Sequence, residues 1–269
     1  MLHNVAGKTP SFLEECRDIV AHSHLLFNLI HRDLTVRYKR SVLGFFWTLL
    51  NPFLMMVILV VVFSNVFRFA LDHYETYFLS EYLPWIFVSQ TTVGSMMSLA
   101  WNGALMKKLR VPRAIFALST TMANLVNLVL SCGPLFIIMI AVGVPLRPAM
   151  LFLPISFVIL AVFVLGVSLG LSSLAIYFDD VAQMYQVAVV GLMYLTPIMY
   201  PIGIIPERFL WLVKWNPLTI LFELVRLPIY GGVLPSLRLL TASVALAGGA
   251  LVLGWLLFRK LSAGFYVRL

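Results

Sequence analysis

Few residues in this chain have the types and the spacing that catalysis or nucleotide binding requires. The segment Gly7–Thr9 resembles the end of a phosphate-binding loop, but Leu2 stands where that loop needs its first glycine. Asp179 and Asp180 form a carboxylate pair, yet no His or Cys stands nearby in the sequence to complete an acid–base or metal site. One of these aspartates is better suited to cap the helix that follows. We therefore expect no catalytic residue, no metal site and no cofactor bound by this chain, which by itself is not an enzyme.

Among the loops, a short connection between two apolar stretches stands out because it carries a cluster of Lys and Arg. The tendency of cytoplasmic loops to carry Lys and Arg explains such charges without any partner. The alternative is a short helix that docks into a cytoplasmic subunit and transmits motion, and the sequence leaves both interpretations open. The candidate docking residues are Lys107, Lys108, Arg110, Val111, Pro112 and Arg113.

Aromatic side chains make up 13% of the chain, and many of them gather in residues 63–85 and 200–215. An aromatic belt at the membrane–water interface accounts for most of them. The alternative is that some line a conduit and stack on sugar rings, while Tyr and Trp offer a polar edge to hydroxyls. An uncharged pathway of this kind would suit a neutral, bulky, hydroxyl-rich cargo.

Six uncharged apolar stretches must position these groups. Each meets or approaches the ~20 residues that a helix needs to cross ~30 Å of hydrocarbon. Lipid offers no hydrogen-bond partners to the backbone, so the sequence predicts an all-α membrane protein. None of the stretches contains an ionisable residue, which argues against a proton- or sodium-coupled transporter. The predicted spans are 45–67, 84–106, 114–142, 150–178, 181–205 and 239–258.

The distribution of charge predicts the orientation. The net charge is +8. With six spans, both termini share a side with residues 107–113 and 179–180, and that side holds 13 Lys and Arg against 6 on the other. Because Lys and Arg are enriched in cytoplasmic loops, we expect both termini in the cytoplasm. The basic surplus then reflects topology and contact with anionic lipid rather than nucleic-acid binding.

Residues 1–44 are predicted to form a cytoplasmic segment that contains an amphipathic helix over Ser11–Arg40. Leu26, Ile30 and Leu34 recur every four residues, and cations cluster before the first span. Such a helix would lie in the headgroup plane with its basic residues toward anionic lipid. The alternative is a helix packed on the rest of the protein. The candidate interfacial residues are Arg37, Tyr38, Lys39 and Arg40.

Residues 206–230, between the last two spans, are predicted to form two short re-entrant helices, Pro206–Trp215 and Pro217–Leu227. Each is apolar but too short to cross a membrane. We expect this pair to form a gate at the outer side, with Thr196–Pro201 as the flexible end of the fifth span. The candidate gate residues are Thr196, Pro197, Pro201, Trp211, Trp215, Asn216 and Pro217.

Four motifs give the chain a family resemblance. The first, before and within the predicted first span, consists of Arg37, Tyr38, Ser41, Leu43, Gly44 and Trp47, followed by Asn51–Pro52. The others are Pro112–Arg113, Thr196–Pro201 and Trp215–Arg226. Together they resemble the permease subunit of bacterial polysaccharide exporters of the type-2 ABC family. Two features depart from that family: Asp179–Asp180 stands where members often have Arg-Asp, and the tail GFYVRL lacks an acidic residue.

The resemblance implies that residues 45–269 form a six-span permease domain in the bacterial cytoplasmic membrane. It further implies a homodimer of permeases with two copies of a separate ATPase subunit, which binds ATP and Mg. The cargo would be a lipid-linked polysaccharide of the O-antigen, capsule or teichoic-acid type. Alternatives are an ABC permease for a drug or lipid, a glycolipid-processing membrane enzyme and a passive channel.

Overall fold

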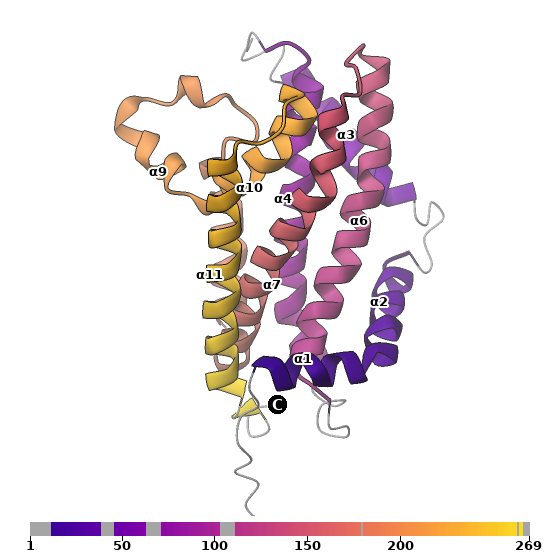
Figure 1. Ribbon diagram of the computed structural model, residues 1–269, viewed down its shortest axis with the longest axis vertical. Coiled ribbons are helices and arrows are strands. Elements are labelled where there is room, and N and C mark those ends of the chain that lie inside the picture. The colour runs from indigo at the N-terminus through magenta and orange to yellow at the C-terminus, as the bar shows by residue number, and fades with distance from the viewer. Residues whose placement is uncertain are drawn as a thin grey trace, which may run out of the picture.

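The computed structural model describes residues 12–38, 46–62, 71–102, 111–178, 180–262 and 264–265. Within these ranges every regular element is a helix and no β-strand occurs, as predicted for an all-α protein. The long helices run along the longest axis of the molecule, and shorter helices lie toward its two ends (Figure 1). This part of the chain is therefore a helical bundle.

Two pairs of long helices form the centre of the bundle. α4 (Tyr74–Trp101) packs against α6 (Ala114–Ala141), and α7 (Leu153–Tyr177) packs against α11 (Leu237–Ser262). α4 also packs against α7, which joins the two pairs. Three helices among the described residues are long and apolar enough to cross a membrane, namely Ala114–Ala141, Pro148–Tyr177 and Leu237–Ser262.

Two predicted spans differ from the helices that form. α4 begins at Tyr74, ten residues before the predicted start at 84, and includes Glu81, which is only 1% exposed. The predicted start is wrong because the search stopped at charged residues, whereas Glu81 is accommodated in the helix by a cationic partner. α8 (Asp180–Leu195) ends ten residues before the predicted 205. Pro197 and Pro201 follow it, and proline lacks the N–H that a continuing helix needs.

The other long elements follow the predicted ranges more closely. α3 (Phe46–Val62) lies within the predicted 45–67, of which residues 63–67 fall outside the described ranges. The 3₁₀ helix η2 (Pro148–Phe152) leads directly into α7, so together they match the predicted 150–178. α6 coincides with 114–142, and α11 extends a few residues beyond each end of 239–258.

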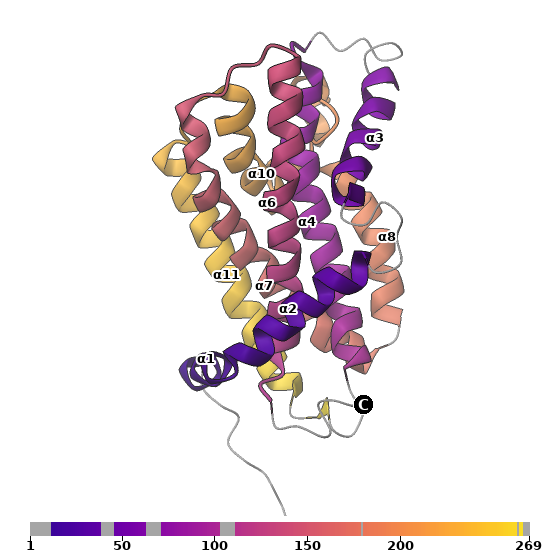
Figure 2. The same ribbon diagram turned by 90° about the vertical axis from the view of Figure 1, so that its right-hand side faces the viewer.

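The N-terminal segment forms two helices instead of one. α1 (Phe12–Ala21) and α2 (Ser23–Tyr38) meet at His22, and α2 runs obliquely across the bundle (Figure 2). Leu29 is 4% exposed and packs in a cluster with residues of α6 such as Phe116, whereas most of α2 is at least partly exposed. α2 thus has a protein contact on one side and leaves its other surface free.

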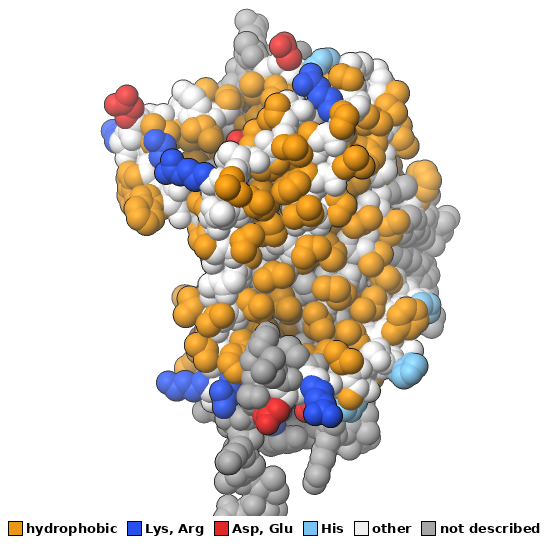
Figure 3. Space-filling model, in the orientation of Figure 1, with side chains coloured by type: hydrophobic (Ala, Val, Ile, Leu, Met, Phe, Trp, Pro, Cys, Tyr) orange, Lys and Arg blue, Asp and Glu red, His pale blue; other side chains and the backbone are white. Residues whose placement is uncertain are grey.

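Charged side chains gather at the two ends of the face drawn in Figure 3, and hydrophobic side chains cover the middle. One end holds α1 and the end of α11, while the other holds α10 (Pro217–Arg226). A band of apolar surface between two charged ends is the pattern that a bilayer imposes on a protein that crosses it.

α7 and α11 approach each other through two glycines. A Cβ atom on Gly254 of α11 would collide with the Gly166 carbonyl of α7, and a Cβ on Gly166 would collide with the backbone at Ala250. Small residues at such a crossing let helix backbones pack closely in a membrane. Neither backbone can move aside without separating the two helices.

We predict that Gly254→Ala destabilises the protein, because backbone atoms occupy the space that the new methyl group needs. Overpacking of this kind costs about 1–3 kcal/mol. Gly248→Ala is the matched control on the same helix, since nothing lies within 4 Å of a Cβ at Gly248. Thermal unfolding in detergent measures both variants. Equal unfolding midpoints would contradict the predicted close contact.

Candidate functional site

The segment that follows α8 is irregular yet buried. Thr196, Ile198 and Met199 are 0%, 0% and 7% exposed, respectively. A buried carbonyl without a hydrogen bond is costly, so this backbone needs donors from elsewhere. Tyr74 on α4 donates its hydroxyl to the carbonyl of Met199 at 2.8 Å, and Tyr77 donates to the carbonyl of Tyr200 at 2.9 Å. The first turns of α4 therefore hold the end of α8 in place.

Arg226, the last residue of α10, supplies a further donor. Its Nη2 bonds the carbonyl of Pro197 at 2.7 Å and also lies 2.5 Å from Oε2 of Glu81. The guanidinium carbon lies 4.1 Å from the centroid of the Tyr77 ring, a cation–π distance. Arg226 is 7% exposed and Glu81 is 1% exposed. The pair thus cancels two buried charges while it ties α10, α4 and the 196–200 segment together.

Asn216 joins the start of α10 to the same segment. Its Oδ1 accepts a hydrogen bond from the backbone N–H of Leu218 at 3.0 Å, which makes it the N-cap of α10. Its Nδ2 donates to Oγ1 of Thr196 at 2.9 Å. Pro217 occupies the first turn of α10, where the missing N–H is not needed. Both ends of α10 are therefore attached to the end of α8.

The structure brings together four of the predicted gate residues and leaves three apart. Thr196, Pro197, Asn216 and Pro217 lie in the attached segments just described. Trp211 and Trp215 are 60% and 84% exposed. They belong to residues 201–215, here called the loop around α9 (Leu210–Lys214), which projects sideways from the bundle (Figure 1). Pro201 is partly buried and precedes the 3₁₀ helix η3 (Ile202–Ile204).

The two short helices predicted before the last span are present with different bounds. The first is a 3₁₀ turn, η4 (Glu207–Phe209), that continues into α9. The second is α10, which ends at Arg226 and continues as a π-helical turn, η5 (Leu227–Gly231). Ser156 of α7 donates its hydroxyl to the carbonyl of Leu224 at 2.9 Å, which fixes α10 against the bundle.

The sequence analysis missed Glu81, Tyr74 and Tyr77, and it gave Arg226 no partner. A usable signal was present, because Glu81 and Arg226 each stand in a run of largely apolar and aromatic residues. Opposite charges in two such segments on one side of a membrane are expected to pair, since an unpaired buried charge is costly.

The predicted docking loop is only partly described. Lys107, Lys108 and Arg110 lie outside the described residues, and Val111, Pro112 and Arg113 are each partly buried. Arg113 donates a hydrogen bond to the carbonyl of Ser262 at the end of α11, and its guanidinium carbon lies 5.5 Å from the centroid of the Phe265 ring. Arg113 therefore contacts the end of the chain itself.

The remaining predicted residues are either outside the described part of the chain or exposed on its surface. Arg37 and Tyr38 end α2, but their side chains lie outside the described set, as do Lys39 and Arg40 entirely. Asp180 is exposed at the first position of α8, and Asp179 is not described. Among the described residues, no three His, Cys, Asp or Glu side chains are grouped as metal ligands. The polar cluster around Arg226 is thus suited to holding backbone in place rather than to chemistry.

We predict that Arg226→Met destabilises the protein by about 3–5 kcal/mol, because it leaves Glu81 buried without a counter-charge. The double variant Glu81→Met/Arg226→Met should be more stable than Arg226→Met alone, since it removes both charges. The control is Arg238→Met, at an exposed position near the start of α11. The unfolding free energies of the wild-type chain, the two single variants Glu81→Met and Arg226→Met, and the double variant are measured in detergent and form a double-mutant cycle. Strictly additive effects would show that the pair is not coupled.

Comparison of the chain with known proteins identifies its family. The model of the ABC-2 type transporter family matches residues 24–230. An O-antigen export system permease protein, RfbA, from Myxococcus xanthus is 30% identical over 89% of this chain and 92% of its own length. RfbA from Klebsiella pneumoniae is 29% identical over 72% of this chain and 75% of its own. The capsule polysaccharide export inner-membrane protein CtrC of Neisseria meningitidis is 21% identical over 82% and 83%. The chain belongs to the ABC-2 type transporter family.

Proposed function

We propose that this chain is the permease half of an ATP-driven exporter that moves a lipid-linked polysaccharide of the O-antigen or capsule type out of the cytoplasm. The observation that carries the proposal is the match to RfbA of Myxococcus xanthus over nearly the full length of both chains. The family match over residues 24–230 supports the transporter role independently of that relative.

In this proposal residues 45–269 form one permease domain in which α3, α4, α6, α7, α8 and α11 cross the bacterial cytoplasmic membrane. Residues 1–44 and both termini lie in the cytoplasm. The 13 Lys and Arg on the terminal side against 6 on the other support this orientation. The charged ends and apolar middle of the molecule also fit it (Figure 3). The cations of Arg37, Lys39 and Arg40 then lie near anionic headgroups, with Tyr38 at the interface.

The permease acts as a homodimer in this proposal, and α8 provides part of the dimer surface. None of its described residues is buried within the chain. Val187 and Tyr194 are 75% and 62% exposed, and the polar Gln183 and Gln186 are also exposed. Polar side chains are costly against lipid and usually face protein or a wet cavity. α3 lies on the same side of the bundle (Figure 2) and exposes Val57, Ile58 and Val61.

Two copies of an ATPase subunit complete the transporter and supply the bound ATP and Mg. Residues Lys107–Arg113 are the proposed docking element, because they form the short basic connection between α4 and α6. Arg113 already contacts the end of α11. We therefore assign contact with the partner chiefly to Lys107, Lys108 and Arg110, and we assign Arg113 to fixing the loop on the permease.

The proposed outer gate consists of Thr196–Pro201, the loop around α9 and α10. A static pore wide enough for a glycan would leak ions, so the pathway must close at rest. In this proposal Trp211 and Trp215, both exposed, close the pathway or stack on the emerging sugar. The buried contacts of Thr196, Pro197, Asn216 and Pro217 provide the fixed base of this gate.

We predict that cells without this chain retain completed polysaccharide in the cytoplasm and lose it from their surface. Expression of the wild-type chain should restore surface polysaccharide, because the permease supplies the only proposed passage. Staining of intact cells and fractionation of the polysaccharide measure the outcome. Deletion of the ATPase subunit is the matched control and should give the same defect. Unchanged surface polysaccharide together with altered drug resistance or lipid composition would favour a different ABC-2 cargo.

We predict that cross-linking the two copies at Trp215→Cys blocks export but leaves assembly intact. The position is 84% exposed, so the substitution does not disturb packing. The background is Cys16→Ser/Cys132→Ala, because these are the 2 native cysteines. Leu151→Cys is the control, also 84% exposed but in η2, just before α7. Normal export by a fully cross-linked Trp215→Cys dimer would move the gate elsewhere.

A further inference from the structure

Polar side chains line the contact between α4 and α6 at regular helical spacing. The rows are Ser95 and Ser98 on α4 with Asn102 directly after its end, and Thr120, Asn124 and Asn127 on α6. Five of the six residues are buried, and Asn102 is partly buried. The helices are close here, because a Cβ on Gly94 would lie 3.2 Å from Cγ2 of Thr120.

The asparagines lie deep along α6. At 1.5 Å per residue, Asn127 is about 20 Å from the start of the helix at Ala114. In the proposed orientation this depth is well inside the hydrocarbon layer. Polar groups at such depth usually face the bundle interior or a wet cavity and indicate a functional site. The simpler explanation is that they bond the two helices to each other.

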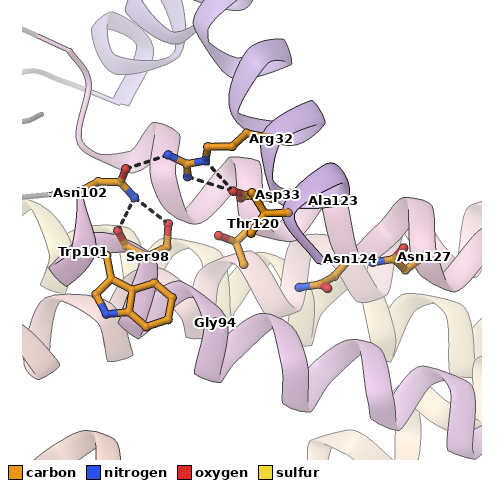
Figure 4. A pocket seen from close by; sticks show the side chains of 11 residues that line it. Arg32, Asp33, Gly94, Ser98, Trp101, Asn102, Thr120, Ala123, Asn124 and Asn127 are labelled. Atoms are coloured by element: carbon orange, nitrogen blue, oxygen red, sulfur yellow. Dashed lines mark hydrogen bonds and ion pairs between the residues drawn. The ribbon is translucent and has the colours of Figure 1, made fainter. Parts of the chain in front are cut away.

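A cavity beside these residues argues against that simpler explanation. It has a volume of about 470 Å³, is partly open to the outside, and is lined by residues of α4, α6 and the oblique helix α2 (Figure 4). Volumes of ~300–1,000 Å³ are typical of small-molecule sites. Side chains that served only to join two helices would be packed without such a space. Thr120, Asn124 and Asn127 all line the cavity.

The charge of the cavity wall favours an uncharged ligand. Nη1 of Arg32 bonds Oδ1 of Asn102 at 3.0 Å, and its Nη2 forms an ion pair with Asp33 at 2.9 Å. Arg32 and Asp33 are the charged residues among those that line the described cavity, so its wall has no net charge. Because Asp33 already pairs with Arg32, the attraction of this cation for a phosphate is weakened.

The other lining groups suit hydroxyls and the apolar face of a sugar ring. Each asparagine amide has two N–H donors and an oxygen with two lone pairs, so it can bond a ligand in addition to a protein group. Trp101 lies at the rim with its indole drawn beside Ser98 and Asn102 (Figure 4), and it is 80% exposed. An indole offers a flat apolar surface with one polar edge.

We propose that this cavity binds a short stretch of the exported glycan, reached from the cytoplasmic side, before the glycan enters the pathway at the dimer interface. The amides of Asn124 and Asn127 bond the hydroxyls of one sugar residue, and Trp101, nearer the cytoplasmic end, stacks on the ring of another. The inference rests on the proposed function, because it takes the exported glycan as the ligand. It adds a site within each protomer, separate from the proposed dimer surface of α3 and α8.

Protection of a cysteine at the rim tests the proposal. Val36→Cys is placed in the Cys16→Ser/Cys132→Ala background of the purified permease, at a lining position that is 63% exposed. Val20→Cys on α1 is the control, 72% exposed and outside the cavity. Three probes are compared: a polyprenyl-pyrophosphate-linked oligosaccharide from the host, the same carrier without sugar, and the free oligosaccharide. The two sugar-bearing probes should slow maleimide labelling of Val36→Cys, while the carrier alone should not.

A probe at about ten times its Kd leaves about one site in eleven free, so labelling should slow about tenfold. Trp101→Ala and Asn127→Leu should abolish this protection. Ser131→Ala should keep it, because the Ser131 hydroxyl bonds the carbonyl of Asn127 and lies outside the cavity. If Asn127→Leu does not fold, the Trp101→Ala variant still tests the proposal, because Trp101 is exposed and its replacement does not disturb packing.

Three outcomes would overturn the proposal: protection by the sugar-free carrier, no protection by any probe, or full protection in Trp101→Ala. Protection by the linked probe but not by the free oligosaccharide would also count against a sugar site. The export assay in cells separates this inference from the proposed function. A chain that is needed for export but shows no protection overturns the site alone. Protection in a chain that is not needed for export overturns the proposed function alone.

Discussion

Arg226 carries a full positive charge at a position where only 7% of the residue is exposed, and the end of the bundle opposite α1 is built around that charge. Desolvation of a buried ion pair is offset better the more of its remaining donors and acceptors are satisfied, and Nε of the Arg226 guanidinium is buried without a hydrogen-bond partner among the described residues. Glu81 balances the charge, the carbonyl of Pro197 accepts a hydrogen bond, and the Tyr77 ring covers the guanidinium. These three groups come from α4 and from the segment after α8, so the pair requires all of these elements to be in place together.

The same contacts constrain how a gate can move. The sequence predicted two short helices, Pro206–Trp215 and Pro217–Leu227, as an outer gate. In the structure Asn216 is 8% exposed, caps α10 and bonds Thr196. A displacement of α10 must therefore carry the 196–200 segment with it, or break several buried hydrogen bonds. The loop around α9 is mostly exposed, although Val213 is 4% exposed, so movement in the proposed gate would fall between Pro201 and Trp215.

The sequence predicted the helical elements well because apolar runs leave the backbone little choice in lipid. It placed α6 within one residue at each end, and it predicted two short helices before α11. It failed where charge and side-chain pairing decide the outcome. A search for uncharged runs cannot include Glu81 in α4, because its partner Arg226 is far along the chain. The cavity beside Asn127 was missed for the same reason, since it lies between helices that are distant in sequence. The turn at His22, between α1 and α2, was also missed.

Two polar regions interrupt the apolar bundle, and they differ in whether open space lies beside their groups. Around Arg226, the tyrosine hydroxyls and the guanidinium bond carbonyls of the chain itself, and the segment they hold is buried. Between α2, α4 and α6, the asparagines and the Trp101 indole border about 470 Å³ of open space. A membrane protein keeps buried polar groups at a cost, so each region needs a compensating role. Contacts to the chain's own backbone explain the first region as architecture, whereas the open space beside the second leaves room for hydrogen bonds to a ligand in addition to those made within the chain.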